Sequence, residues 1–382
     1  MVKKTPYRSA KSLSKAPPKP KPKPAPKQPA EPTSAPAPPL LPLNLQQSLL
    51  NLFNTSFSAV LSSPSLPALL QSTKEALYAR DFDAAFARAS QESLEAYAAR
   101  WSPTRALGYA SVLVGLDSHL KSLERQIQVP AGPDSGSAPA VSENEEPHGD
   151  EPAARDDRQP TASIKILALG GGAAELAASA AILSLNPSLH ASVHLLDSAP
   201  WSAVTGTLLS AIVNPPPLSK YASAATKASN AALVSSASIS STFSQLNMLD
   251  LSRDEWAGTM GGESLLVTLL FTLNELYTSA GIGKTTSFLL NLTATIPDGS
   301  LLLVVDSPGS YSEAAVGKES KKYPMQWLLD HTLVKDEPVE GCLWEKVDSH
   351  DSVWFRLADS LKYPIPLENM RYQMHLYRAT RP

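Results

Sequence analysis

Cysteine is almost absent from this chain of 382 residues, in which Cys342 is the single example. One thiol excludes an intrachain disulfide and a zinc site built from several cysteines, so we expect a reducing compartment and no metal. Long hydrophobic runs are also missing. No stretch reaches the about 18 uninterrupted apolar residues of a membrane span, and no apolar segment of signal-peptide length follows the first residue. We therefore expect neither a membrane span nor secretion.

The 34 prolines and the charged residues are unevenly distributed. Residues 1–42 form a basic arm in which lysine alternates with proline and Glu31 is the first acid. Such a sequence cannot build a packed core, so we expect disorder with polyproline-like stretches. Its lysines favour nuclear targeting or RNA tethering, and a merely solubilising tail is the alternative. Residues 129–162, rich in Pro, Gly, Ser and acids, are predicted to be a second disordered segment, an acidic linker.

Two folded parts remain. Residues 43–128 show helical spacing at 43–54, 69–81, 83–89, 93–100 and 106–128, and we name them the helical unit. Trp101 and Arg105 could touch a substrate, although so apolar a unit is more often a packing layer. Residues 163–382 alternate strand-like and helical patterns, which predicts an α/β doubly wound parallel sheet. Its strands are expected at 164–169, 192–196, 240–246, 265–271, 300–306, 352–357 and 372–377.

The first predicted strand ends in Gly170-Gly171-Gly172, and a helical pattern follows at once. Glycines there tolerate positive φ and let the backbone approach a ligand. The next strand ends in Asp197, where nucleotide-binding α/β folds place a carboxylate for the ribose hydroxyls. The alternative for Asp197 is a helix N-cap or a loop acid. Trp201 either stacks on an adenine or covers the strand.

Three further stretches contain candidate polar groups. At the end of the third strand, Asn247 or Asp250 can accept from an adenine amino group, and Asp250 could instead be an N-cap. After the fourth strand come Asn274, Glu275 and Tyr277, near the place where a transferred group would meet its acceptor. Glu275 and Tyr277 could equally begin the next helix.

The run 280–286 looks like part of a phosphate-binding loop but lacks the glycine that this motif needs at position 278. We expect a loop there, with Thr285 or Thr286 as N-cap, and no nucleotide triphosphatase.

Aromatic and basic residues interleave between positions 351 and 378. This mixture suits stacked bases and phosphate contacts, or the half-buried face of a strand. We take Trp354, Arg356 and Arg371 as candidates for substrate binding.

Several motifs together resemble the fungal family of the S-adenosylmethionine-dependent 25S rRNA uridine-N3 methyltransferase. They are Leu-Ala-Leu-Gly-Gly-Gly-Ala-Ala-Glu at 167–175, Leu-Leu-Asp at 195–197, Asn-Glu-Leu-Tyr at 274–277, Trp-Phe-Arg at 354–356 and Tyr-Pro-Ile-Pro-Leu-Glu-Asn-Met-Arg-Tyr-Gln at 363–373. The resemblance covers 163–378 well and 43–128 loosely. It implies a Rossmann-like methyltransferase sheet of seven strands.

For the site, the resemblance implies that Gly170, Gly171 and Gly172 border the methionine part of S-adenosylmethionine. Asp197 would hold the ribose, and Asn247 or Asp250 would lie beside the adenine. The acid that many methyltransferases have just before the glycines is replaced by Ala168-Leu169, so Glu175 is our candidate for the cofactor's amino group.

Methylation at N3 of a uridine requires a base for the N3 proton, and our first candidate is Glu275, with Asn274 and Tyr277 beside it. The expected partner is 25S rRNA or a pre-ribosome, bound by a monomer in the nucleus or nucleolus and also in the cytoplasm.

Two alternatives stay open. A non-catalytic ribosome-assembly protein could use the same fold. An NAD-dependent oxidoreductase would share the glycine turn and Asp197, but its motif needs a third glycine at position 175, which is Glu.

Overall fold

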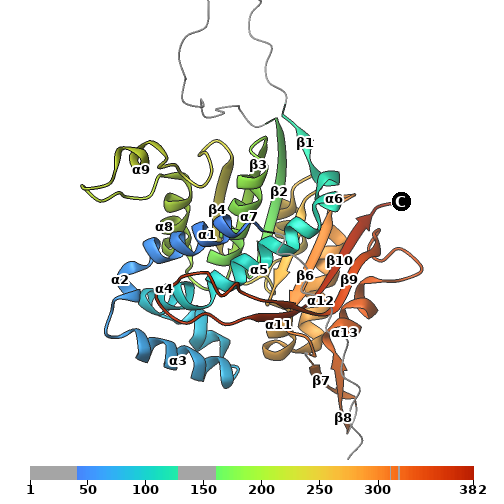
Figure 1. Ribbon diagram of the computed structural model, residues 1–382. Helices are drawn as coiled ribbons and strands as arrows, with labels where there is room; N and C mark the ends of the chain where they lie inside the picture. Colours follow the sequence, from blue (N-terminus) through green and yellow to red (C-terminus); the bar gives the residue numbers. More distant parts are fainter. Residues whose placement is uncertain (1–40, 128–160, 310, 317–318) are drawn as a thin grey trace, which may run out of the picture. The chain divides into compact units, whose positions relative to one another are not determined.

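The computed structural model describes residues 41–127, 161–309, 311–316 and 319–382. The predictions for the basic arm and for nearly all of the acidic linker concern residues outside these ranges. These described residues belong to one compact unit, in which helices cover both faces of a central β-sheet (Figure 1). No helix among the described residues is long and apolar enough to cross a membrane.

The sheet has the spatial order β4-β3-β2-β5-β6-β10-β9. Five of these strands are parallel, while β10 runs antiparallel to both β6 and β9. All seven predicted strands are present, and their bounds are β2 (Ala162–Leu169), β3 (Leu189–Asp197), β4 (Ile239–Gln245), β5 (Leu266–Leu270), β6 (Leu301–Asp306), β9 (Leu343–Phe355) and β10 (Met370–Thr380).

Two predictions are wrong: that the sheet has seven strands, and that one helix spans 106–128. The sheet has eight strands, because the short β1 (Arg125–Gln126) pairs antiparallel with the start of β2. The helix ends early, at Gly115, and two short helical segments, Asp117–Leu120 and Lys121–Leu123, lead to β1. The Arg125 guanidinium donates to Ser264 O at 2.7 Å and pairs with Glu263 at 2.5 Å, which holds the extended segment against the loop before β5.

The chain reverses its winding between β2 and β5. From β2 it proceeds to β3 and β4 on one side, and then returns to β5 and β6 on the other. In open α/β sheets, ligands bind at the carboxyl ends of the strands where the winding reverses. The glycine turn after β2 and the residues after β5 lie at this point.

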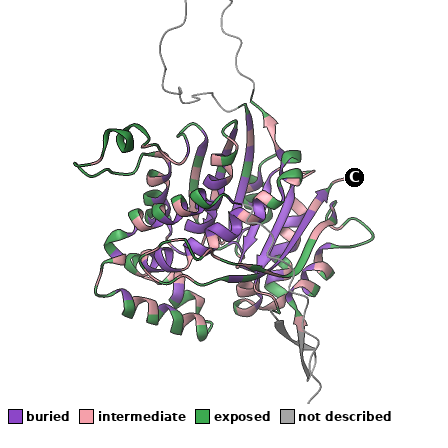
Figure 2. Cartoon of the chain, viewed as in Figure 1, coloured by how far each residue is buried: buried purple, intermediate pink, exposed green. Residues whose placement is uncertain are grey.

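Alternating residues of each strand feed two hydrophobic cores. In β2, Ile164, Ile166 and Ala168 pack on one side, and Leu167 and Leu169 on the other. The first core receives helices of the helical unit together with α7 (Ala173–Leu185) and α8 (Ser202–Val213). The second receives α10 (Arg253–Met260), α11 (Leu273–Ser279), α12 (Gly281–Thr295) and α13 (Met325–Leu333). Figure 2 shows the sheet buried between these layers.

The helical unit packs over the sheet face that bears α7. Its described helices are α1 (Leu43–Ser56), α2 (Ser58–Leu61), α3 (Leu66–Tyr78), α4 (Gln91–Arg100), α5 (Ser102–Gly115) and α6 (Asp117–Leu120), with the helical turns η1 (Asp83–Ala87) and η2 (Lys121–Leu123). Further described elements are α9 (Ala224–Ala228) and the hairpin β7 (Tyr311–Val316) and β8 (Glu319–Pro324), which the sequence did not predict.

The loop between β9 and β10, residues 356–369, crosses back over the helical unit, and we call it the strap (Figure 1). The Tyr363 hydroxyl donates to Ala99 O at 2.7 Å. Arg100 pairs with Glu368 at 2.5 Å. The strap therefore joins the end of α4 to the far edge of the sheet, and it contains the most characteristic motif of the sequence.

Candidate functional site

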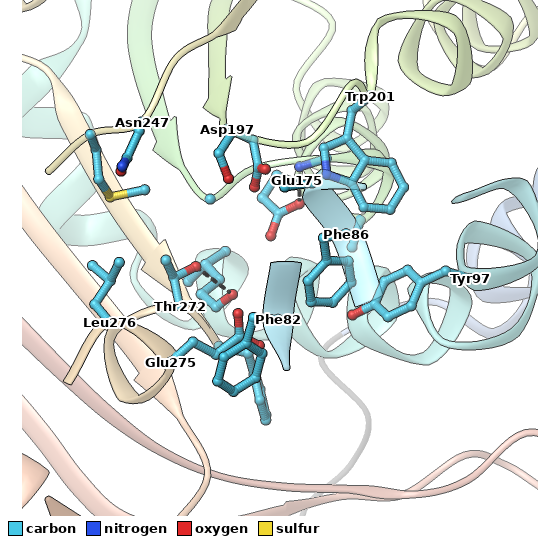
Figure 3. Close-up of a pocket in the computed structure, with 18 of the residues that line it drawn as sticks. Phe82, Phe86, Tyr97, Glu175, Asp197, Trp201, Asn247, Thr272, Glu275 and Leu276 are labelled. Atoms are coloured by element: carbon cyan, nitrogen blue, oxygen red, sulfur yellow. Dashed lines mark hydrogen bonds between the residues drawn. The ribbon is translucent and has the colours of Figure 1, made fainter. Parts of the chain in front are cut away.

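A pocket opens at the reversal of the sheet, between the glycine turn, the ends of β3 and β5, and the helical unit. Figure 3 shows Asp197 and Asn247 along one side, Thr272 and Glu275 along the opposite side, and Glu175 between them. The structure thus brings together candidate residues from four separate stretches of sequence.

Each glycine of the turn meets a different constraint. Gly170 has φ +69°, and a Cβ there would clash with the Thr272 side chain. A Cβ on Gly171 would come within 2.6 Å of the Ala168 Cβ. Gly170 and Gly172 line the pocket, whereas Gly171 is required by the packing of the turn itself.

Two acidic residues lie at the pocket, one in the helix after the glycine turn and one at the end of β3. Glu175 is buried in the first turn of α7, where its Oε2 accepts from the Gly172 N–H at 2.7 Å. Asp197 Oδ1 accepts from the Ala199 N–H at 2.6 Å, an Asx-type turn that fixes the carboxylate at the strand end. Burial raises the pKa of Glu175 and raises the pKa of Asp197 to about 7. A hydrogen bond from the Trp201 side chain also acts on Asp197 and opposes this rise in its pKa.

Asn247 also lines the pocket, but Asp250 does not. Asn247 Nδ2 donates to Asp250 Oδ2 at 2.8 Å, so the two alternatives form one hydrogen-bonded pair. The interpretation of Asp250 as an N-cap is wrong, because Ser252 caps α10 by accepting from the Glu255 N–H at 3.3 Å.

The residues after β5 form the opposite side. Phe271 has φ +59°, a left-handed conformation that is costly for a residue with a side chain and that is often found at functional sites. Glu275 follows in α11 and lines the pocket. Burial raises the pKa of Glu275 to about 8, against the opposing effect of the nearby Arg105 charge.

Asn274 and Tyr277 do not line the pocket. Tyr277 is buried in the second core, and the backbone N–H of Asn274 donates to Asp306 Oδ2 at 2.9 Å. Asp306 was not a candidate. Its carboxylate, 2% exposed, also accepts from the Ser307 N–H at 2.7 Å and holds the start of α11, which presents Glu275. Catalytic roles for Asn274 and Tyr277 stay predictions.

The helical unit supplies one wall of the pocket, and of its two residues that could touch a substrate, Arg105 lines the pocket and Trp101 does not. Phe86, Tyr97 and Arg105 line the pocket with Trp201. The ring centroids of Tyr97 lie 5.0 Å from Phe86 and 5.7 Å from Trp201. The Trp201 ring packs directly against Gly172, since a Cβ added to Gly172 would lie 3.4 Å from it. Trp201 belongs to the first hydrophobic core and also lines the pocket.

Trp354, Arg356 and Arg371 form a second cluster, outside the pocket. The Cζ atoms of both arginines lie 5.6 Å from the Trp354 ring, which is 52% exposed. Arg371 of β10 lies opposite Trp354 of β9 in the sheet. Two residues later in β10, Gln373 lies opposite Asp306, the last residue of β6. The cluster therefore lies at the same edge of the sheet as the pocket.

The run 280–286 does not form a loop. It begins α12, and the Thr285 hydroxyl donates back to Gly281 O at 2.9 Å inside the helix. Thr285 is therefore not an N-cap. Among the described residues, no group of three or more His, Cys, Asp or Glu could hold a metal ion.

The polar groups of the pocket fit S-adenosylmethionine. The carboxylates of Asp197, at the end of β3, and of Glu175, in the first turn of α7, suit its ribose hydroxyls and its ammonium group, and the tight glycine turn permits close approach of the methionine part. A dinucleotide would require a third glycine where Glu175 caps α7.

Comparisons with known proteins agree. A family model described as "Putative SAM-dependent methyltransferase" matches residues 53–378. The 25S rRNA (uridine(2843)-N(3))-methyltransferase of Saccharomyces cerevisiae is 30% identical over an alignment of length 361 that covers 87% of this chain and 85% of that protein.

Solved structures are more distant. The 16S rRNA (adenine(1408)-N(1))-methyltransferase of Catenulisporales acidiphilia is 14% identical, with a TM-score of 0.34 over 57% of this chain and 89% of its own. A SAM-dependent methyltransferase of Methanosarcina mazei is 10% identical, with a TM-score of 0.33 over 59% and 95%. From the family model and the yeast relative, the chain belongs to this family of SAM-dependent methyltransferases.

Proposed function

We propose that the protein methylates N3 of a uridine in the RNA of the large ribosomal subunit, 25S rRNA or a pre-ribosome. The observation that carries the proposal is the pocket, which joins Asp197, the glycine turn and Glu275 at the reversal of the sheet. The extensive similarity to a yeast uridine-N3 methyltransferase supports this choice of acceptor.

On the cofactor side, Asp197 accepts hydrogen bonds from the ribose hydroxyls and Asn247 lies beside the adenine, with Asp250 holding its amide. Glu175 binds the ammonium group and replaces the acid that many methyltransferases have where this chain has Ala168-Leu169. Gly170, Gly171 and Gly172 keep the turn tight enough for close approach. When bound, S-adenosylmethionine supplies an electrophilic methyl group on its sulfonium.

On the acceptor side, Glu275 removes the N3 proton. A buried carboxyl whose pKa is raised to about 8 is a much stronger base than an ordinary carboxylate, and its affinity for a proton is matched to a weakly acidic N–H. Asp306 orients the first turn of α11 through the Asn274 N–H and thereby positions Glu275.

The edge cluster of Trp354, Arg356 and Arg371 receives the RNA. An exposed indole between two guanidinium groups offers stacking to a base and charge to phosphates. Since a uridine must be unstacked to enter a pocket, such a platform near the opening suits a flipped or looped nucleotide.

Mass-spectrometric mapping of rRNA from cells with and without the protein tests the proposal. We expect one N3-methyluridine to disappear from the large-subunit RNA and to return with the wild-type protein. Unchanged modification would contradict the proposal and favour a role in ribosome assembly without catalysis. A tagged protein should be found in the nucleus or nucleolus, and it should sediment as a monomer when free of RNA.

A further inference from the structure

The pocket contains one basic side chain, whose negatively charged partner is either the cofactor's carboxylate or the methyl acceptor. Among the described residues that line it, Arg105 stands with four acids, Asp83, Glu175, Asp197 and Glu275. A cofactor with a net positive charge gains from the acids and loses from an arginine in a site of low dielectric constant. The arginine therefore indicates a group in the pocket that bears negative charge.

The guanidinium of Arg105 is held in a fixed position. Its Nη1 donates to the Tyr97 hydroxyl, and its Cζ lies 4.9 Å from the Phe271 ring centroid and 5.6 Å from that of Tyr97. Arginine has five N–H donors, and this is its single hydrogen bond to the described part of the chain. It makes no ion pair with any described carboxylate, so its charge and its remaining donors are available to a ligand.

Arg105 lies on the acceptor side of the pocket. Phe271, over which it stacks, follows β5, whereas Asp197 follows β3, and β2 separates these two strands. Among the charges that act on Glu275, that of Arg105 has the largest effect. The proton acceptor and the guanidinium therefore face the same space, on the side away from the ribose site.

Loss of the N3 proton places negative charge on the uracil ring, shared by N3 and by the carbonyl oxygens O2 and O4 on either side of it. The N3–H bond breaks and its proton passes to the Glu275 carboxylate. The N3 lone pair then bonds the methyl carbon while the methyl–sulfur bond breaks and its electrons stay on sulfur. A preorganised donor beside a carbonyl oxygen is most effective when such charge develops.

We propose that Arg105 is a catalytic residue that donates hydrogen bonds to a carbonyl oxygen of the uracil as the N3 proton leaves, stabilising the uridine anion. This inference rests on the proposed function and adds to it the group that makes the N3 proton removable. Because Tyr97 and Phe271 fix the guanidinium before the substrate enters, little reorganisation is needed during the reaction.

The test compares Arg105→Gln with wild type on two RNAs, one with uridine and one with 5-fluorouridine at the target. Fluorine withdraws electrons and makes the N3 proton more acidic, so the uracil anion requires less stabilisation by the enzyme. We expect R105Q to lower kcat on uridine RNA by about 10–100-fold, the range of one lost charge-assisted hydrogen bond. The loss on 5-fluorouridine RNA should be several-fold smaller, and the affinity for S-adenosylhomocysteine should be unchanged.

Two further variants control for structure. Arg105→Lys keeps the charge without the planar fork, so it should retain more activity than R105Q. Arg100→Gln removes another buried arginine of the helical unit, one that pairs with Glu368, and should not alter the ratio of rates on the two RNAs. Because this ratio is taken on one enzyme preparation, partial unfolding of a variant does not change it.

Equal losses on both RNAs would overturn the inference. So would weaker binding of S-adenosylhomocysteine with a normal kcat at saturating cofactor, since Arg105 would then hold the cofactor's carboxylate. These outcomes leave the proposed function intact as long as the wild-type protein forms N3-methyluridine. Absence of that product from the wild-type reaction would overturn the proposed function and the inference together.

Discussion

The two sides of the pocket are built from different chemistry. The sheet side contributes carboxylates at the ends of strands, with Glu175, Asp197 and Glu275 all buried enough for their pKa values to be raised. The helical unit contributes aromatic rings and Arg105. A cationic cofactor is matched by the first side, and a ring that becomes anionic during methyl transfer is matched by the second.

The two sides also differ in what holds them in place. On the sheet side, Glu175 and Asp197 are fixed by backbone N–H groups three and two residues away, those of Gly172 and Ala199. The helical wall is fixed by distant parts of the chain, through the strap and through close packing of Gly108 against Met370. Changes on the sheet side should therefore alter the chemistry locally, and changes at the strap should act on the wall as a whole.

The largest expected effect is on the proton acceptor. Glu275→Gln should lower the single-turnover methylation rate by about 100-fold or more, because the amide cannot take the N3 proton. Since the pKa of Glu275 is about 8, the wild-type rate should rise with pH up to about pH 8 and then level off. Rapid-quench measurements from pH 6 to 9 give both results. A variant with full activity would remove Glu275 from the mechanism.

Asp197→Asn should weaken S-adenosylhomocysteine binding by about 10–100-fold, as expected for the loss of a charged acceptor. With a pKa of about 7, wild-type Asp197 is ionised only at higher pH, so calorimetry should find affinity rising from pH 6 to 8. The variant should show no such rise. If wild type and variant follow the same pH dependence, another group controls binding.

The same substitution should affect stability with a defined sign. The folded-state pKa of Asp197 lies above its ordinary value of 3.8, so the folded protein binds more protons than the unfolded chain between those values. Stability from this group is lost as pH rises through about 7. Asp197→Asn should therefore be more stable than wild type at pH 8 but not at pH 3, as measured by urea denaturation.

Gly170→Ala tests the turn itself. The positive φ and the clash with Thr272 should lower the free energy of unfolding by about 1–3 kcal/mol. Gly206→Ala is the matched control, since Gly206 lies inside α8 with nothing within 4 Å of its Cβ position, and it should stabilise by up to about 1 kcal/mol. Equal effects of the two substitutions would show that the turn is not under this constraint.

The smallest expected effect is at the strap. Tyr363→Phe removes the hydrogen bond to Ala99 O and should cost about 0.5–1.5 kcal/mol of unfolding free energy. Urea denaturation measures this loss, and Tyr221→Phe, at a tyrosine that is 95% exposed, should be neutral in the same experiment. If Tyr363→Phe also lowers kcat without changing the affinity for the cofactor, the strap helps to position the helical wall of the pocket.

Much of the sheet side was predictable from the sequence. Apolar runs ending in glycine or in an acid located β2 and β3, and the carboxyl ends of neighbouring parallel strands meet at one edge of the sheet. The sequence therefore predicted that Gly170, Asp197 and Glu275 would come together. Their local roles follow from backbone geometry and from hydrogen bonds within a few residues, which a sequence pattern reflects directly.

Other features depended on distant contacts. Arg105 is one basic residue in an apolar helical pattern, and no local signal shows that α5 carries it over Phe271, more than 160 residues later in the chain. Likewise β1 exists because Arg125 is bound to Glu263 and Ser264, far along the sequence. The motif at 363–373 was noticed as characteristic, yet its contact with α4 was not evident from the residues.

The sequence by itself determined the α/β class, the acidic side of the pocket and the absence of a cysteine-based site, since each follows from composition or from the period and ends of single elements. The tertiary structure alone decided which helical residues close the pocket and which candidates, such as Tyr277, are turned into the core. The physical reason is that burial and charge pairing are set by packing between segments far apart in the chain, and local patterns contain no information about that packing.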